Sequence, residues 1–186
     1  VYKRQVVSRV KEAGAIIVGK TTVPEFGYSA VGHSPVSPVA RNPWNPDLTP
    51  GGSSAGSAIA LAAGMTPLAL GSDGGGSVRI PASLCGLVGF KASMGRVPLY
   101  PGCRDERYPG VSSWETLEHI GPMTRTVGDA ALLMSVLAGP DPRDRHSLPA
   151  GDVDWLGAVG DDARERLSGL RIAFSPDLGY LPGLSL

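Results

Sequence analysis

Two segments rich in glycine and serine constrain this chain more than any other feature. They read GGSSAGSA at residues 51–58 and GSDGGGSVRIPA at residues 71–82. Glycine is required where the backbone adopts a positive φ or where another group approaches the main chain closely. Because both segments lie in a non-repetitive chain that is 42% hydrophobic, we interpret them as parts of a functional site and not as a disordered linker.

The composition excludes several classes of protein. Lys and Arg together number 17, as do Asp and Glu, so the formal net charge is zero. Nucleic-acid and membrane-surface binding need a clustered excess of positive charge, and no apolar run approaches the 18 residues of a membrane span. The cysteines are too few for a disulfide framework, and the histidines show no metal-ligand spacing; these residues are Cys85, Cys103, His33, His119 and His146. We therefore expect no metal, no cofactor and no nucleic-acid partner.

The pattern of apolar residues predicts helices alternating with short strands. Helices are predicted at residues 6–13, 55–63, 126–138 and 161–167, with a short helix or turn at 78–84. Buried strands are predicted at residues 15–18, 67–70, 87–90 and 170–174. The region 21–52 is irregular and holds six prolines, and so long a loop is usually functional. This alternation predicts an α/β fold with a buried sheet.

Residues 14–21, GAIIVGKT, match the phosphate-loop pattern G-x-x-x-x-G-K-S/T. That loop needs a strand before it and a helix after it. Here the middle residues 15–18 favour being the strand itself, and Pro24 disfavours a helix after Lys20. Nucleotide binding is therefore an alternative that we disfavour.

A second motif, GSSAG at residues 52–56, fits the nucleophile elbow G-x-S-x-G with Ser54 at its centre. The elbow needs a strand that leads directly into the turn, and a downstream acid and histidine. Residues 47–50 (DLTP) make a poor strand, and His119 and His146 lie in ordinary polar surroundings. We therefore disfavour Ser54 as a nucleophile.

The third interpretation takes Lys20 together with both glycine-serine segments. One predicted helix and one predicted strand separate these segments, so both can lie at the same edge of the sheet. If the strands at 15–18 and 67–70 run parallel, their carboxyl ends present Lys20 and Ser77 to one crevice.

Four segments in this order resemble the amidase signature family of serine amidases over nearly the whole chain. They are AGAIIVGKTTVPEFG, RNPWNPDLTPGGSSAGSA, GSDGGGSVRIPASLCGLVGFKAS and HIGPMTRTVGDAALLMSVLAG. The resemblance implies an α/β fold with a mixed central sheet covered by helices on both faces. Since the sequence starts at Val1, we expect residues 1–186 to be a partial amidase domain that lacks its N- and C-terminal parts.

The resemblance also implies a Ser-Ser-Lys triad that hydrolyses a carboxamide through an acyl-enzyme. Ser77 would be the nucleophile, Ser53 the relay and Lys20 the base, and the Gly52–Ser53 peptide bond would be cis. An ammonium group cannot act as a base. Burial of Lys20 among residues such as Ile17 and Val18 would favour its neutral form, because desolvation disfavours charge.

Other residues are expected to support this triad. Backbone N–H groups can stabilise the oxyanion of the tetrahedral intermediate, and the expected donors are Gly74, Gly75, Gly76 and Ser77. The resemblance implies that Asp73 orders the loop and that Arg79 pairs with a carboxylate. We expect Thr49 and Ser54 to hydrogen-bond the relay.

The preferred reading is a general soluble amidase for a small-molecule amide. The alternative is the glutaminase subunit of a tRNA-dependent amidotransferase. Such subunits favour threonine and glutamine where this chain has Gly74 and Ile80, which weakens that alternative. A catalytically silent amidase-like subunit is a third interpretation. We expect a cytoplasmic protein with no membrane association, and a homodimer is the assembly considered.

Overall fold

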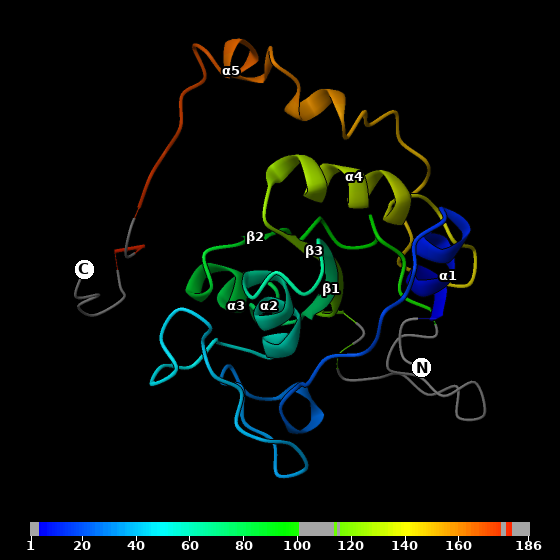
Figure 1. Cartoon of the computed structure of the whole chain (residues 1–186). Helices are drawn as coiled ribbons and strands as arrows, with labels where there is room; N and C mark the ends of the chain where they lie inside the picture. The colour runs from blue at the N-terminus through cyan, green and yellow to red at the C-terminus, as the bar shows by residue number, and fades with distance from the viewer. Residues whose placement is uncertain (1–3, 101–113, 115, 176–177, 180–186) are drawn as a thin grey trace.

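The computed structural model describes residues 4–100, 114, 116–175 and 178–179, so Cys103 lies outside the described residues. Figure 1 shows the arrangement of the elements. The helices are α1 (Arg4–Glu12), α2 (Ala55–Ala62), α3 (Arg79–Leu84), α4 (Val127–Leu137) and α5 (Ala163–Arg166). The strands are β1 (Leu68–Asp73), β2 (Val88–Gly89) and β3 (His119–Thr124), and the 3-10 turns are η1 (Glu25–Gly27) and η2 (Gly157–Val159).

The described strands form one antiparallel sheet in the order β1-β3-β2. The central strand β3 pairs with β1 from Leu68↔Thr124 to Asp73↔His119. It pairs with β2 at Val88 and Gly89. Asp73 therefore ends β1 at the edge from which the loop at residues 74–78 leaves the sheet.

Helices cover both faces of this sheet (Figure 1). Successive side chains of a strand point to opposite faces. Ile120 of β3 packs with residues of α1 and α4, whereas Met123 packs with residues of α2 and α3. This three-layer arrangement confirms the predicted α/β fold with helices on both faces.

Most of the predicted elements are present with small shifts at their ends. All five predicted helices form, although α5 is shorter than the predicted 161–167. The strands predicted at 67–70 and 87–90 correspond to β1 and β2. None of the helices in the described part of the chain is long and apolar enough to cross a bilayer.

The predictions of strands at residues 15–18 and 170–174 were wrong, because neither segment has regular structure. A strand needs a neighbouring strand to pair its backbone groups, and neither segment pairs with one among the described residues. Their apolar side chains lie in the open, with Ile16 88% and Ile172 80% exposed. The parallel arrangement of 15–18 with 67–70 is therefore absent from the described sheet.

Strand β3 is the element that the sequence pattern did not predict. It contains Gly121 and Pro122, and both residue types argue against a central strand. Only Ile120 and Met123 carry large apolar side chains, one toward each core. The strand forms because these two side chains pack on both sides of the sheet while β1 and β2 pair with its edges.

The N-terminus of α4 is fixed by a side-chain hydrogen bond. The Thr126 hydroxyl accepts a hydrogen bond from the Asp129 amide at 3.1 Å and so caps the helix. Thr126→Ala should lower the free energy of unfolding by about 1 kcal/mol, because the amide loses its acceptor. Urea unfolding measures this change. Thr126→Ser should retain most of the stability, and Ser135→Ala, at an exposed position of the same helix, should cost nothing. An unchanged midpoint for Thr126→Ala would contradict the capping role.

Candidate active site

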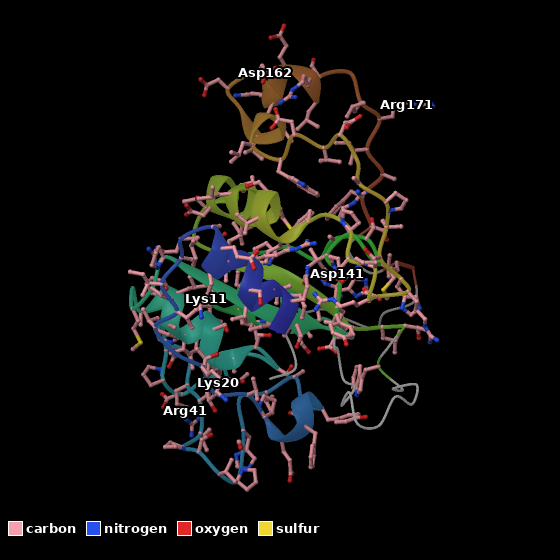
Figure 2. All side chains as sticks on the ribbon, turned by 90° about the vertical axis from the view of Figure 1, so that its right-hand side faces the viewer. Lys11, Lys20, Arg41, Asp141, Asp162 and Arg171 are labelled. Carbon is pink, nitrogen blue, oxygen red and sulfur yellow. The ribbon has the colours of Figure 1, made fainter. Side chains whose placement is uncertain are left out.

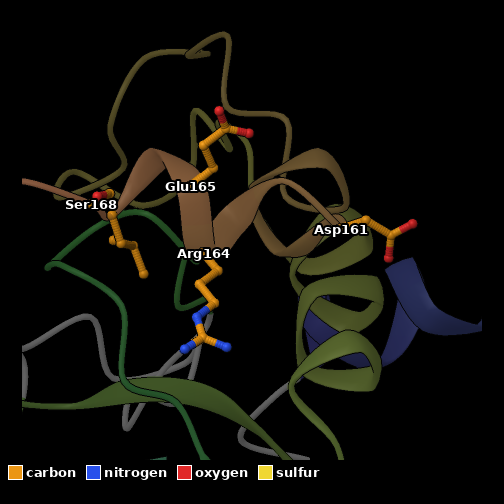
Figure 3. A pocket seen from close by; sticks show the side chains of 5 residues that line it. Asp161, Arg164, Glu165 and Ser168 are labelled. Carbon is orange, nitrogen blue, oxygen red and sulfur yellow. The ribbon is translucent and has the colours of Figure 1, made fainter.

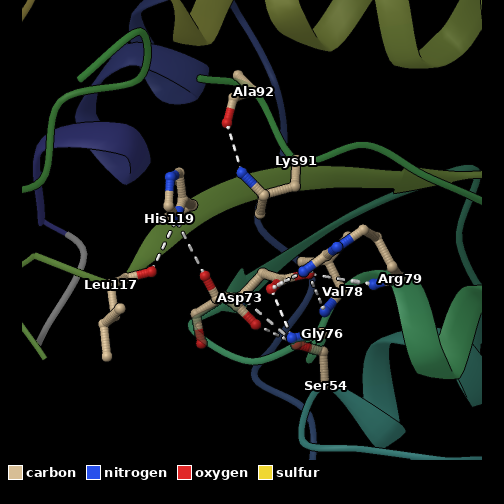
Figure 4. A network of polar contacts seen from close by, with 10 residues as sticks. Ser54, Asp73, Gly76, Val78, Arg79, Lys91, Ala92, Leu117 and His119 are labelled. Atoms are coloured by element: carbon tan, nitrogen blue, oxygen red, sulfur yellow. Dashed lines mark hydrogen bonds and ion pairs between the residues drawn. The ribbon is translucent and has the colours of Figure 1, made fainter. Parts of the chain in front are cut away.

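The buried carboxylate of Asp73 organises the loop that carries Ser77 (Figure 4). Asp73 is fully buried and accepts hydrogen bonds from the amides of Gly76 at 2.7 Å and Val78 at 3.2 Å. The Arg79 guanidinium donates to both carboxylate oxygens at 2.9 Å. Because Ser77 lies between Gly76 and Val78, its backbone is held on both sides.

The charge of Asp73 depends on these donors. Burial by itself raises the pKa of the Asp73 carboxyl, but the hydrogen bonds from Arg79 and from the Gly76 and Val78 amides outweigh burial and lower the pKa to about 2. The hydrogen bond with Asp73 likewise raises the pKa of Arg79. The loop is therefore built around an ion pair that stays charged at neutral pH.

His119 also contacts the end of β1. One of its ring nitrogens, Nδ1, lies 3.2 Å from the Asp73 carbonyl oxygen and 2.7 Å from that of Leu117. These contacts with backbone carbonyls give His119 a structural role at the end of β1 (Figure 4).

The second glycine-serine segment lies against the first. The Gly52–Ser53 peptide bond is cis, which confirms that expectation, and Ser53 is only 5% exposed. The Ser54 amide donates to the Ser77 carbonyl at 3.2 Å. The structure thus brings the turn that holds Ser53 next to the loop that holds Ser77.

The hydroxyl of Ser54 is engaged by strand β1. It accepts a hydrogen bond from the Ser72 amide at 3.2 Å and donates to the Ser72 carbonyl at 3.4 Å. No strand is present in residues 46–52, although a nucleophile elbow requires one. Both observations disfavour Ser54 as a nucleophile. Its hydroxyl instead connects the turn at residues 51–54 to strand β1 through Ser72.

Lys20 lies in an irregular segment that is anchored at the start of α2 (Figure 2). The Thr21 hydroxyl is 3.1 Å from that of Ser57, and the Gly56 amide donates to the Thr22 carbonyl at 3.1 Å. A Cβ at position 56 would lie 2.6 Å from the Thr22 nitrogen, so glycine is needed for this approach. Lys20 is thereby held near the turn that carries the two serines at the start of α2.

The expected burial of Lys20 is not present. Its side chain is exposed, and Ile17 and Val18 are 51% and 79% exposed. Residues 15–18 pair with no strand of the described sheet, and no described element covers them. Within the described residues, no hydrogen bond joins the Lys20 amine to Ser53 or Ser77.

The phosphate-loop interpretation lacks its helix. After Lys20 the next regular element is η1, a single 3-10 turn at Glu25–Gly27, and α2 begins only at Ala55. A helix N-terminus directly after the lysine is what a phosphate loop provides, so the structure disfavours nucleotide binding at Lys20.

The expected oxyanion donors are not equivalent. The Gly76 amide is engaged by Asp73 at 2.7 Å, whereas the amides of Gly74, Gly75 and Ser77 have no acceptor within the described part of the chain. These three amides are therefore the donors available to a ligand. Thr49 accepts a hydrogen bond from the Gly51 amide at 3.1 Å and shapes the turn without bonding Ser53.

Sequence reasoning missed an aromatic pair at this site. Tyr28 and Trp114 pack edge to face with ring centroids 5.1 Å apart, and the Trp114 indole N–H donates to the Tyr28 hydroxyl at 3.1 Å. A Cβ at Gly74 would lie 2.5 Å from Cζ3 of Trp114. The unusual glycine at position 74 was the only signal, because the two rings are 86 positions apart.

A separate hollow lies beside α5 (Figure 3). Its lining contains none of the expected site residues, and consists of Asp161, Arg164, Glu165, Leu167 and Ser168. Within the residues that the structure describes, no group of three His, Cys, Asp or Glu side chains could hold a metal ion. The candidate active site therefore remains at the two glycine-serine segments.

Comparison with known proteins identifies similar chains. The family model described as Amidase matches residues 1–184. The A subunit of glutamyl-tRNA(Gln) amidotransferase from Desulforapulum autotrophicum is 43% identical over 98% of this chain and 36% of its own length. The chain therefore spans about a third of the length of that relative.

Solved structures agree with this family match. The A subunit of glutamyl-tRNA(Gln) amidotransferase from Thermotoga maritima is 44% identical with a TM-score of 0.65, over 78% of this chain and 30% of its own. A bacterial aryl acylamidase of the amidase signature enzymes is 39% identical with a TM-score of 0.71, over 82% and 30%. The fold expected from the resemblance is thereby confirmed.

The Asp73 ion pair predicts a pH-dependent stability. Because the pKa of Asp73 is lowered in the folded state from 3.8 to about 2, its contribution is present above about pH 4 and is lost as the pH falls toward 2. That shift corresponds to about 2 kcal/mol. Asp73→Asn should lose about this much at pH 7, and the difference from the unmodified protein should shrink toward pH 2.

Urea unfolding at a series of pH values measures this difference. Asp47→Asn is the control, because Asp47 is exposed and lies outside the loop. A difference between Asp73→Asn and the unmodified protein that stays constant between pH 7 and pH 2 would contradict the proposed origin of the stability.

Proposed function

The chain belongs to the amidase family, and on this premise we propose that it hydrolyses a carboxamide C–N bond with Ser77 as nucleophile, Ser53 as relay and Lys20 as base. The observation that carries the proposal is the hydrogen bond from the Ser54 amide to the Ser77 carbonyl, at 3.2 Å. It joins the turn with the cis Gly52–Ser53 bond to the loop ordered by Asp73. This contact supports the proposal, because it joins the two segments that carry the proposed nucleophile and relay.

The proposed chemistry begins with proton transfer. A serine hydroxyl is a weak nucleophile and needs an adjacent base. Neutral Lys20 accepts the proton of Ser53, and Ser53 accepts that of Ser77 as the Ser77 oxygen attacks the amide carbonyl. The same protons return through Ser53 to the leaving amine, which departs as the C–N bond breaks. Water, activated by the same residues, then hydrolyses the acyl-enzyme.

The amides of Gly74, Gly75 and Ser77 are the proposed oxyanion donors. Their N–H groups have no other acceptor within the described residues, and donors that are already oriented need no reorganisation during the reaction. The Gly76 amide is not an oxyanion donor in this proposal, because its hydrogen bond to Asp73 fixes the loop. We therefore reduce the four expected donors to three.

Lys20 must be neutral to act as a base. Its side chain is exposed among the described residues, whereas the neutral form of an amine is favoured by removal from water. Desolvation therefore has to come from groups outside the described residues, the bound substrate included. On this proposal, the neutral form of Lys20 is favoured only when the crevice is closed or occupied.

The names of the relatives favour the glutaminase alternative over the general soluble amidase that the sequence reading preferred. The amidotransferase A subunits of Desulforapulum and Thermotoga are 43% and 44% identical to this chain. On that basis we propose glutamine as one candidate substrate and a complex with other subunits as the corresponding assembly. A homodimer and a cytoplasmic location also stay proposals.

A second candidate is an amidase for other small amides. Gly74 favours it, because the Trp114 ring occupies the space in which a side chain at position 74 would lie. The similarity to the aryl acylamidase, at 39% identity, is consistent with this candidate. Both candidates share the proposed triad.

The nucleophile is tested by labelling the intact protein with a fluorophosphonate probe. Ser77→Ala should abolish labelling and amide hydrolysis, because the attacking hydroxyl is removed. Ser54→Ala is the matched control and should still be labelled, since the Ser54 hydroxyl only bridges to Ser72. Labelling that persists in Ser77→Ala and vanishes in Ser54→Ala would support the elbow. An unmodified protein that is never labelled would support a silent subunit.

The base is tested by Lys20→Arg. A guanidinium stays protonated at all working pH values, so it keeps the charge and much of the size of lysine but cannot accept a proton. We expect the rate of hydrolysis to fall by about 10²–10⁴-fold, the usual contribution of a general base. Steady-state kinetics measure this loss. Activity retained in Lys20→Arg, or ATP binding that depends on Lys20, would refute the assignment.

A further inference from the structure

We propose that Tyr28 and Trp114 form one wall of the substrate pocket and select amides that carry a flat, apolar aryl group at the scissile bond. This inference rests on the proposed function, because it assigns a substrate class to the same site. It uses two residues that the triad mechanism does not involve.

The aromatic pair connects the two sides of the site. On one side, a Cβ at Gly27 would lie 3.6 Å from the Ser53 hydroxyl oxygen, and Tyr28 is the next residue. On the other side, the Trp114 ring lies against Gly74, three positions before Ser77. The pair therefore spans the space between the relay serine and the loop of the nucleophile.

The Tyr28 ring presents apolar surface to solvent. Tyr28 is 69% exposed although it packs edge to face with Trp114. The hydroxyl of Tyr28 accepts a hydrogen bond from the Trp114 indole N–H. The exposed part of Tyr28 is therefore mainly ring surface, which favours another aromatic ring in an offset or edge-to-face arrangement.

A second aromatic side chain lies two positions before Tyr28. Phe26 is 85% exposed and has a φ of +50°, a left-handed conformation that is costly for a bulky residue. Strained backbone of this kind clusters at functional sites. The chain thus exposes two large aromatic side chains, Phe26 and Tyr28, within three consecutive residues.

Position 74 and position 114 depend on each other. A Cβ at position 74 would lie 2.5 Å from Cζ3 and 2.7 Å from Cε3 of Trp114, so any side chain there would displace the ring. A threonine at position 74 could not coexist with the Trp114 ring in this place.

The test compares three substrates on the intact protein. These are an aryl amide (p-nitroacetanilide), an aliphatic amide (propionamide) and L-glutamine, each measured as kcat/KM. The unmodified protein should prefer the aryl amide. Trp114→Ala should lower kcat/KM for the aryl amide about tenfold, the size expected for one lost aromatic contact, and change that for propionamide far less.

Tyr28→Ala is a second variant, and it should not disturb the interior because Tyr28 is exposed. It should also lower the preference for the aryl amide over propionamide, whereas Tyr28→Phe should keep most of that preference. Trp44→Ala removes a tryptophan that is 70% exposed and lies outside the site, so it should leave the preference unchanged. Fluorophosphonate labelling of Ser77 verifies that each variant is folded.

Gly74→Thr tests the coupling between the two positions. It should lower the aryl preference by displacing Trp114, and it should have little further effect in the Trp114→Ala background, since coupled positions are not additive. Equal effects in both backgrounds would contradict the coupling.

Two results would overturn the inference while the proposed function stands. One is an active, labelled Trp114→Ala or Tyr28→Ala protein with an unchanged substrate preference. The other is an unmodified protein that prefers glutamine. If the unmodified protein hydrolyses none of the amides and Ser77 is not labelled, the proposed function fails and the inference fails with it.

Discussion

The buried carboxylate of Asp73 is the contact on which the geometry of the candidate site depends. Three glycines in succession have no side chains with which to fix a conformation, and glycine loses more backbone entropy on ordering than any other residue. Asp73 supplies the missing contacts by accepting from the Gly76 and Val78 amides and from Arg79. One ion pair thus turns a flexible sequence into a loop with oriented N–H groups.

Because Asp73 binds only some of the backbone amides of the loop, the others remain available as donors. A carboxylate that bound every amide of the loop would leave no donor for an oxyanion, and one that bound none would leave the loop unfixed. Here the Gly76 amide is used for structure, while those of Gly74, Gly75 and Ser77 have no acceptor among the described residues. Placing a negative charge close to donors intended for a developing oxyanion is unfavourable, and the Arg79 guanidinium offsets that charge.

The sequence predicted the parts of this chain that local patterns determine. Helix α4 has its own cap at Thr126, and the resemblance named Asp73, Ser53 and Ser77 from contiguous motifs. What it missed depends on distant partners. Residues 15–18 have the composition of a strand but no neighbour among the described residues, and β3 has Gly121 and Pro122 yet pairs on both sides. The contact of Tyr28 with Trp114 joins positions that no local pattern connects.

Lys20 shows how exposure and mechanism have to be reconciled. Thr21 and Thr22 hold its backbone against the start of α2, so the position of the segment is set before any substrate arrives, but its side chain remains in solvent. A lysine that acts as a base has to be neutral, and removal from water favours that form. An aryl group seated against Tyr28 and Trp114 would exclude water from Ser53 and, if Lys20 reaches Ser53 as proposed, would favour the neutral amine. On this argument, substrate selection and activation of the base are two consequences of one burial event.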